Sequence, residues 1–292
     1  MALYFRQPVG IVVPIHARCV GVSLRVREDA PAPEDWTLDV RLASSLLGRV
    51  PERILVPAVA WQFRLFEPEL GRIDEFVPED GAAVDVGVWW GPWSWWLAKR
   101  VPRVDSFEPN AGLVGRVGPV LPANVNLHQV ALSDSEGRSS LWIPTGGTGT
   151  EGRASLESGV GSVEGWRKLS VPTARLDDFS LSDVGFIKID VEGHELAVLH
   201  GAAELLGNQR PNLLIEIEQH SSRPHNLDAV IDYLRTFSYA GEYLNKGTWH
   251  PIEELDRVHM RNIADRSRSR GYVKSQLLDA RRYVHNFVFK PR

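Results

Sequence analysis

Short apolar runs alternate with longer amphipathic stretches from about residue 81 onward. Each run is bounded by turn or helix-start residues, and its length and apolar character are typical of a buried strand. Strands that alternate with helices form parallel sheets with crossover connections, so the pattern predicts an α/β domain. The expected strands are Ala83–Val86, Arg103–Phe107, Val125–Gln129, Gly185–Asp190 and Asn212–Ile217.

A helix is expected between the last two strands, because leucine and alanine residues recur there at helical spacing. Gly207 and Asn208 supply its stop signal. The end of the chain departs from the alternation: Tyr272–Leu278 and Asn286–Lys290 read as two strands with no helix between them. We therefore expect a mostly parallel sheet with a C-terminal antiparallel hairpin.

Residues 1–80 carry a different pattern, with short β-like runs at Val9–Val13 and Val20–Val26 and a helical stretch at Leu38–Leu47. No low-complexity linker follows them. We predict an N-terminal β/α extension, residues 1–80, that packs as a cap on a main domain of residues 81–292.

Composition limits the function only broadly. The chain has 43% hydrophobic and 24% charged residues and a formal net charge of −4, which gives no general reason to expect a nucleic-acid partner. The single cysteine, Cys19, excludes an internal disulfide and is typical of a reducing compartment. The first residues form neither a signal peptide nor a transmembrane segment, because Pro8 and Pro14 break a short apolar run. We expect a cytoplasmic protein.

Three stretches have two interpretations each. Five tryptophans, at positions 89, 90, 93, 95 and 96, either pack a helix face or line a pocket over an adenine or a sulfonium. The glycine-rich segment Thr145–Ser155 is expected to be a loop, either functional or disordered. The basic segment Arg257–Arg270 is either a solvated helix face or a contact for an acidic or phosphorylated substrate.

The first chemical motif is the turn after the strand Ala83–Val86, where Asp85 is followed by Gly87 and Gly91. Glycines let the backbone bend tightly and approach a ligand, and such turns lie at the carboxyl ends of parallel strands, where ligands bind. The spacing G-x-x-x-G lacks the fingerprint that holds a pyrophosphate. A cofactor without a pyrophosphate would not need that fingerprint.

Glu108 follows the next strand, about 20 residues after Gly87, which is the offset at which an acidic residue accepts hydrogen bonds from an adenosine ribose. NAD and S-adenosylmethionine both carry that ribose, so Glu108 does not choose between them. The alternative is a carboxylate that caps the helix after Pro109.

The third motif brings acidic residues and a histidine to the end of the strand Gly185–Asp190. Asp190 and Glu192 follow the strand, and His194 lies at the start of the next helix. A histidine among carboxylates at this edge of a sheet is a candidate for proton transfer. Alternatively, Glu192 and Glu195 cap the helix and His194 is solvated.

Several of these strings together resemble the FkbM-type family of methyltransferases. They are DVG-x-x-x-GPWSWWLAKR, FEPN, ALSDSEG, LDDF at Leu176–Phe179, KIDVEGHE and LLIEIEQH. The resemblance implies a Rossmann-like class I methyltransferase fold, S-adenosylmethionine as cofactor and O-methylation of a hydroxyl group on a sugar, glycolipid or related natural product. One departure is that Val88 and Trp89 replace the Ala and Asn of the family's usual DVGAN-x-G turn.

The resemblance also implies roles for individual residues. Asp85, Gly87 and Gly91 would hold the methionine end of the cofactor, Glu108 the ribose, and Ala131 with Leu132 the adenine edge. Asp190, Glu192 and His194 would lie beside the methyl acceptor. Trp89, Ser94, Pro109 and Asp190 complete the expected cofactor-binding set.

For the reaction, we expect His194, or His220 after the strand Asn212–Ile217, to take the proton of the acceptor hydroxyl. Glu192 or Glu218 would orient that base or bind the acceptor. The clustered carboxylates are compatible with a divalent metal, although their spacing does not demand one. Two alternatives stay open: a nicotinamide-dependent oxidoreductase, and a non-catalytic protein that binds an adenosyl ligand.

Overall fold

A computed structural model of the chain describes residues 50–145, 154–156, 165–218, 226–260, 262 and 284–292. The predicted elements at residues 9–47 and Tyr272–Leu278, most of the glycine-rich loop and most of the basic segment lie outside these ranges. Among the described helices, none is long and apolar enough to cross a membrane.

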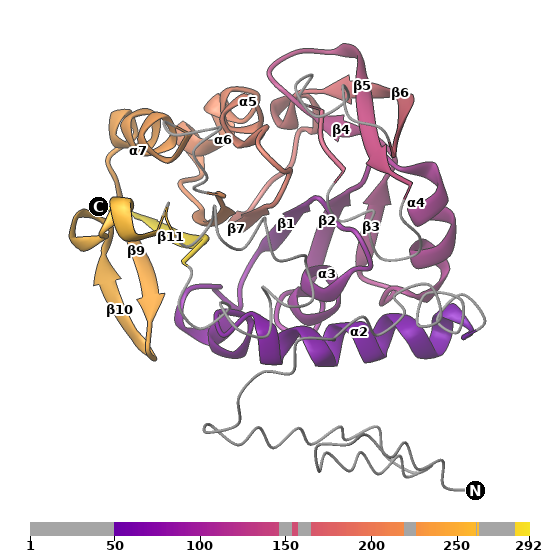
Figure 1. Cartoon of the computed structure of the whole chain (residues 1–292), viewed down its shortest axis with the longest axis horizontal. Coiled ribbons are helices and arrows are strands. Elements are labelled where there is room, and N and C mark those ends of the chain that lie inside the picture. Colours follow the sequence, from indigo (N-terminus) through magenta and orange to yellow (C-terminus); the bar gives the residue numbers. More distant parts are fainter. Residues whose placement is uncertain (1–49, 146–153, 157–164, 219–225, 261, 263–283) are drawn as a thin grey trace, which may run out of the picture.

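The centre of the molecule is an eight-stranded sheet with the order β10-β9-β11-β8-β7-β1-β2-β3 (Figure 1). The strands β1, β2, β3, β7 and β8 pair in parallel and correspond to the five strands expected from the apolar runs. Their bounds are Ala82–Val86, Arg103–Phe107, Val125–His128, Val184–Ile189 and Asn212–Glu216. This mostly parallel α/β sheet confirms the predicted Rossmann-like fold.

The last strand, β11 (Asn286–Pro291), is antiparallel to both of its neighbours, β8 and β9. An antiparallel strand at this end of the sheet was expected, but the predicted hairpin with Tyr272–Leu278 is wrong, because β8 and β9 occupy both sides of β11. The strands that flank it are distant in sequence, and a short hairpin of β9 (Tyr239–Asn245) and β10 (Thr248–Pro251) forms the edge.

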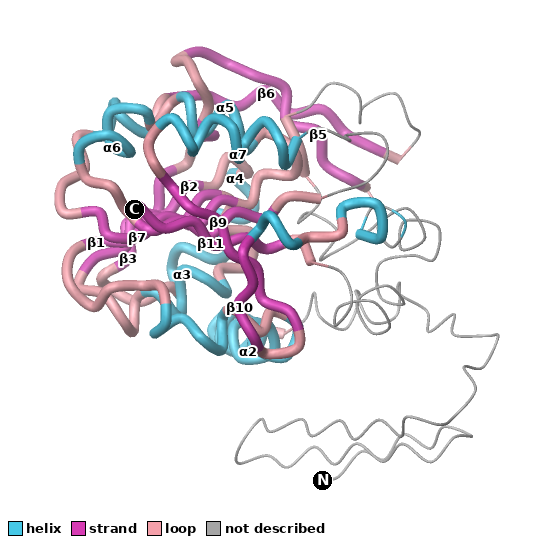
Figure 2. The backbone as a smooth tube through the Cα atoms, turned by 90° about the vertical axis from the view of Figure 1, so that its left-hand side faces the viewer, coloured by secondary structure: helices cyan, strands magenta, loops and turns pink. Residues whose placement is uncertain are grey.

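Helices cover both faces of the main sheet, so that the molecule has three layers (Figure 2). One face carries α5, α6 and α7, and the other carries α2 and α3. The helix bounds are Glu52–Phe66 (α2), Pro92–Leu97 (α3), Ala111–Val117 (α4), Glu195–His200 (α5), Ala203–Asn208 (α6) and Asn226–Thr236 (α7).

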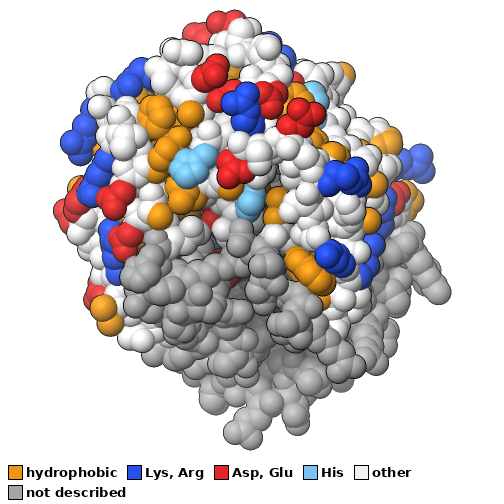
Figure 3. All heavy atoms as spheres, turned by 90° about the horizontal axis from the view of Figure 1, so that it is seen from above, with side chains coloured by type: hydrophobic (Ala, Val, Ile, Leu, Met, Phe, Trp, Pro, Cys, Tyr) orange, Lys and Arg blue, Asp and Glu red, His pale blue; other side chains and the backbone are white. Residues whose placement is uncertain are grey.

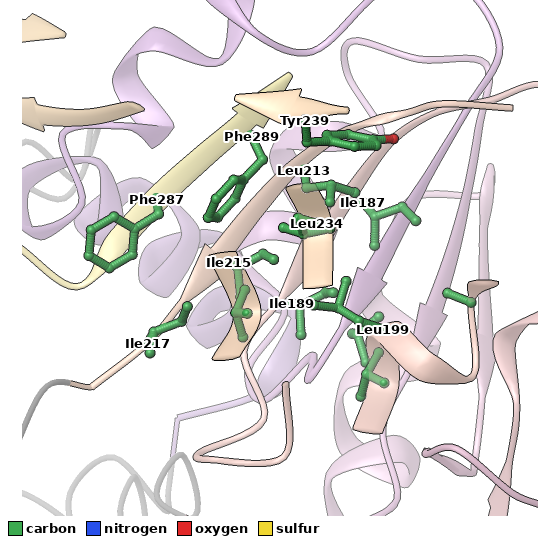
Figure 4. Packing of buried hydrophobic residues seen from close by; sticks show 14 of the residues in the cluster. Ile187, Ile189, Leu199, Leu213, Ile215, Ile217, Leu234, Tyr239, Phe287 and Phe289 are labelled. Atoms are coloured by element: carbon green, nitrogen blue, oxygen red, sulfur yellow. The ribbon is translucent and has the colours of Figure 1, made fainter. Parts of the chain in front are cut away.

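The largest apolar cluster lies between the sheet and the layer of α5, α6 and α7 (Figure 4). Alternate residues of β7, β8 and β11 supply it, as expected for strands whose side chains point to the two faces in turn. Examples are Ile187, Ile189, Leu213, Ile215 and Phe287, which are almost completely buried. A second cluster on the opposite face contains Phe186, Leu214 and Val288, the neighbours of those residues in the same strands.

The helix expected between β7 and β8 is interrupted, so that α5 and α6 are separate. The break lies at Gly201, where the backbone touches the loop after β4: a Cβ on Gly201 would lie 2.0 Å from the carbonyl oxygen of Ser133. This close approach explains why the leucine periodicity, although correct, does not produce one continuous helix.

A second, three-stranded sheet with the order β4-β6-β5 lies beside the main one. Its strands are Ala131–Leu132 (β4), Gly137–Pro144 (β5) and Trp166–Ala174 (β6). Ser155 forms a bridge with Trp142 of β5, and its Oγ donates a hydrogen bond of 2.7 Å to the carbonyl oxygen of Glu192. The small sheet is thereby joined to the loop that follows β7.

Candidate active site

The turn between β1 and α3 has the backbone conformation that its glycines predict. Gly87 and Gly91 have φ angles of 88° and 77°, in the left-handed region that glycine adopts without steric cost. Gly91 is also tightly packed, because a Cβ on it would lie 2.9 Å from Cδ2 of Leu121. Gly87 lies against the backbone of Asp190, so the turn after β1 and the loop after β7 are in direct contact.

Asp85 lies beneath this turn and is 1% exposed. Its Oδ2 accepts a hydrogen bond of 2.5 Å from Oγ of Ser94, and that hydroxyl also lies 2.9 Å from Oγ of Ser106. Burial raises the pKa of Asp85 to about 6, although Ser94 and the ammonium group of Lys188 favour its charged form. Ser94 therefore holds Asp85 in place from the first turn of α3.

Glu108 is buried at the end of β2, and both of its carboxylate oxygens face the two neighbouring turns. Oε2 accepts a hydrogen bond of 3.0 Å from the backbone N–H of Trp89, and Oε1 accepts one of 2.9 Å from the backbone N–H of Asn110. Burial raises its pKa to about 7 in spite of these two bonds. Asn110, and not Glu108, supplies the side-chain cap of α4, since its Oδ1 accepts from the N–H of Gly112. Pro109 lies between them and is half-buried.

The tryptophans around the turn pack against the helices. Trp89 has a φ of 49°, and its ring lies 5.2 Å from that of Phe63 in α2. Trp90 is buried and packs under the guanidinium of Arg116, while Nε1 of Trp96 donates to a carbonyl oxygen of α2. These contacts favour the packing interpretation for the cluster. They also show that residues 50–66 cover the turn.

Ala131 and Leu132 form β4 and are buried, with Ser133 directly after them. Oγ of Ser133 lies 2.9 Å from Nε2 of His194, at the start of α5. The expected adenine edge and the expected base are therefore neighbours in space, although 61 positions separate Ser133 and His194. The signal for this contact, a serine after an apolar pair, is too weak to read from the sequence.

The loop after β7 carries Asp190 and Glu192, which line one cavity, and it ends at His194, which contacts Ser133 and is not part of the cavity lining. Glu192 has a φ of 54° and Gly193 one of 103°, so the chain turns sharply before α5. Glu195 is buried and accepts hydrogen bonds of 2.6 Å from the N–H of Gly193 and from Nδ2 of Asn226. Glu195 thus ties the turn before α5 to α7, and it does not cap α5, which has no side-chain cap.

A small cavity of about 10 Å³ opens beside this loop, between the ends of β7 and β8. Its volume is close to that of a single water probe. Seen from the side of α5, α6 and α7, the described surface mixes acidic, basic and apolar side chains, with histidines near its centre (Figure 3). The cavity is lined by Asp190, Glu192, Gly193, Glu195, Glu216, Glu218 and Asn226.

Three charged residues near the cavity had no role assigned from the sequence: Glu67, Lys188 and Glu216. Lys188 is completely buried, with Nζ 3.6 Å from Oδ2 of Asp190 and 3.8 Å from Oε2 of Glu216. Alternation along β7 places its side chain on the same face as that of Asp190, which is the signal that could have found it. Glu67 follows α2 and is distant in sequence from every motif.

The predicted role of His220 and the possible metal site both remain predictions. His220 lies outside the described residues, so its position relative to Glu218 is not assigned. Within the described ranges, no group of three or more His, Cys, Asp or Glu side chains is arranged to hold a metal ion.

Residues 81–241, more than half of the chain, match the sequence model of the methyltransferase FkbM domain. The chain belongs to the FkbM family of methyltransferases. The FkbM domain contains the glycine turn, Glu108, the small sheet and the acidic loop after β7, while α2 and Glu67 precede it and β11 follows it.

Two solved structures with a similar course of the chain are distant in sequence. The FkbM methyltransferase from Methylobacillus flagellatus KT is 17% identical with a TM-score of 0.43, over 70% of this chain and 55% of that chain. An rRNA methylase from Streptococcus thermophilus is 11% identical with a TM-score of 0.38, over 77% and 95%. This chain spans about half the length of the Methylobacillus protein. No curated protein sequence matches it.

Proposed function

We propose that this FkbM-family protein is an S-adenosylmethionine-dependent O-methyltransferase that acts on a hydroxyl group of a sugar, glycolipid or related natural product. The observation that carries the proposal is the contact between Gly87 and Asp190. It makes the glycine turn and the carboxylate-lined cavity two parts of one continuous site at the carboxyl ends of β1 and β7, where α/β sheets bind ligands.

The residues of the turn fit the adenosyl part of the cofactor. A carboxylate has about four acceptor positions on its two oxygens, and backbone N–H groups fill only one on each oxygen of Glu108. Glu108 can therefore accept two further hydrogen bonds, the number that the two hydroxyls of a ribose donate. Ala131 and Leu132 offer an apolar edge for the adenine.

When bound, S-adenosylmethionine supplies an activated methyl group whose bond to sulfur breaks as the bond to the acceptor oxygen forms. The protein must hold that oxygen in line with the methyl group and take the hydroxyl proton. The side chain of His194 or His220 accepts this hydroxyl proton. Glu192 and Asp190 accept hydrogen bonds from the other hydroxyls of the acceptor, a task suited to carboxylates that line a small cavity.

The test is calorimetric binding of S-adenosylmethionine and S-adenosylhomocysteine to the wild-type protein and to Glu108→Ala. We expect the wild type to bind both ligands, and Glu108→Ala to bind each at least about tenfold more weakly. Glu242→Ala is a matched control, because Glu242 forms an ion pair with Lys290 far from the turn. Absence of binding by the wild type, or binding of NADH in its place, would contradict the proposal.

A further inference from the structure

Five ionisable side chains form one cluster on the α2–α3 face of the sheet: Glu67, Asp85, Lys188, Asp190 and Glu216. Lys188 lies at its centre. Asp190 and Glu216 are its nearest anionic groups, at 3.6 and 3.8 Å, and Asp85 is its register partner on β1. Burial lowers the pKa of Lys188, but the carboxylates around it outweigh that effect and raise it overall.

Glu67 joins this cluster from the segment after α2, which lies outside the FkbM domain. It is 8% exposed, and its Oε2 accepts a hydrogen bond of 2.6 Å from Nε1 of Trp93. Trp93 in turn lies over Lys188, with Nζ 5.8 Å from the ring centroid. The indole thus fixes Glu67 on one side and covers the ammonium group on the other.

The cluster holds more negative than positive groups. Four carboxyl groups surround the ammonium group of Lys188, and no other Lys or Arg among the described residues forms an ion pair with any of the four. Nε2 of His285 lies 3.9 Å from Oε1 of Glu216. Such an excess is costly in a buried place, where charges are poorly solvated. Burial accordingly raises the pKa of Glu67 to about 7 and that of Glu216 well above its ordinary value.

We infer that this cluster makes the cofactor site select the cationic sulfonium over the neutral thioether, and that Lys188 limits the strength of that selection. The inference rests on the proposed function. The backbone of Asp190 contacts Gly87, so the cluster is adjacent to the glycine turn. Its negative charge, which is greatest above about pH 7 where Glu67 is ionised, attracts a positive charge held above the turn.

The physical basis is a comparison of two ligands that differ only in the methyl group and its charge. S-adenosylmethionine carries a positive sulfur, whereas S-adenosylhomocysteine does not. A change of charge in the cluster therefore alters the affinity for the first ligand and leaves that for the second nearly unchanged. Selection of this kind retains the methyl donor and releases the product.

The experiment measures both affinities by calorimetry at about pH 8, where Glu67 is ionised, in the wild type, Lys188→Met and Glu67→Gln. Lys188→Met removes the ammonium group at the centre of the cluster, so the affinity ratio in favour of S-adenosylmethionine should rise about threefold or more. Glu67→Gln removes one carboxylate and should lower the ratio by a similar factor. Its amide oxygen can still accept the Trp93 hydrogen bond, so this variant keeps the packing. Lys290→Met, which removes a cation on β11, should leave the ratio unchanged.

The outcomes separate the inference from the proposed function. If both ligands bind and the ratio stays constant in the two cluster variants, the inference is wrong and the proposed function stands. If neither ligand binds the wild type, both fail. If Lys188→Met does not fold, Glu67→Gln decides the question alone. Its affinity ratio should change in the opposite direction, and the variant keeps the hydrogen bond from Trp93.

Discussion

The α-carbon of Gly87 faces the carbonyl oxygen of Asp190 so closely that a Cβ on Gly87 would lie 1.9 Å from that oxygen. No real Cβ contact is that short, and the φ of 88° would strain any other residue as well. The backbones of β1 and β7 therefore meet at a point that only glycine permits, at the junction of the two halves of the proposed site.

Gly87→Ala should separate the two loops. We expect weaker binding of S-adenosylhomocysteine by at least about tenfold and a lower free energy of unfolding, because the loop after β7 must move away. Calorimetry and denaturant unfolding measure the two effects. Gly115→Ala is the control: Gly115 lies in α4 with nothing near its Cβ position, and alanine there should be neutral or slightly stabilising. Equal behaviour of both variants would contradict the prediction.

Glu67 should make the stability of the protein depend on pH. Burial raises its pKa from 4.5 to about 7, so the folded protein holds this proton more tightly than the unfolded chain does. The contribution of Glu67 to the free energy of unfolding therefore falls as the pH rises from 4.5 to 7, and is constant above that range. Glu67→Gln should flatten this part of the profile.

Denaturant unfolding across that pH range checks the effect of Glu67→Gln. Glu79→Gln is a suitable comparison, because the Glu79 side chain is 76% exposed and forms only a surface ion pair with Arg100. Its profile should match that of the wild type. A Glu67→Gln profile as steep as the wild-type one would show that other carboxyl groups produce the slope.

Ser94→Ala removes the hydroxyl that donates to Asp85. Because Asp85 is buried, loss of this donor should lower the free energy of unfolding by about 1–3 kcal/mol. Thermal or denaturant unfolding measures it. Ser135→Ala removes a similar bond to Asp134 at the surface and should change stability by less than about 0.5 kcal/mol. Equal losses in the two variants would contradict the role given to Ser94.

The assignment of the base predicts that methyl transfer is lost in His194→Ala or in His220→Ala. The measurement is transfer of a labelled methyl group from S-adenosylmethionine to a panel of sugar acceptors, at saturating cofactor. A base contributes about 100-fold or more to the rate, so the loss should be large while cofactor binding is retained. Activity that survives in both variants would exclude both histidines.

The parallel core was predictable because β1, β7 and β8 are buried on both faces and read as nearly continuous apolar runs. The strands β5 and β6 were missed for the opposite reason. They lie in a small sheet and carry exposed polar residues such as Arg138 and Arg167, so their composition is close to that of a loop.

The glycine turn and the acidic loop were predicted because each is local in the sequence. The charged cluster was not, since Glu67 and Lys188 meet only through the packing of α2 on the sheet. A lysine inside an apolar strand gives a signal, because lysine is almost never buried without partners. Asp190 is only two positions away, but the other partners, Glu67, Asp85 and Glu216, come from three separate parts of the chain, and no local pattern links them to Lys188.

The position of β11 between β8 and β9 has a consequence for how the chain reaches its final state. Until β11 forms, one edge of β8 is unpaired, and the hairpin of β9 and β10 has no strand of the main sheet to pair with. The pairing of β11 with β8 completes the described sheet and closes a loop of about 70 residues. Such non-local pairing slows folding and leaves strand edges exposed to other chains until it forms. The acidic end of β8 therefore becomes part of a finished site only after β11 has paired with it.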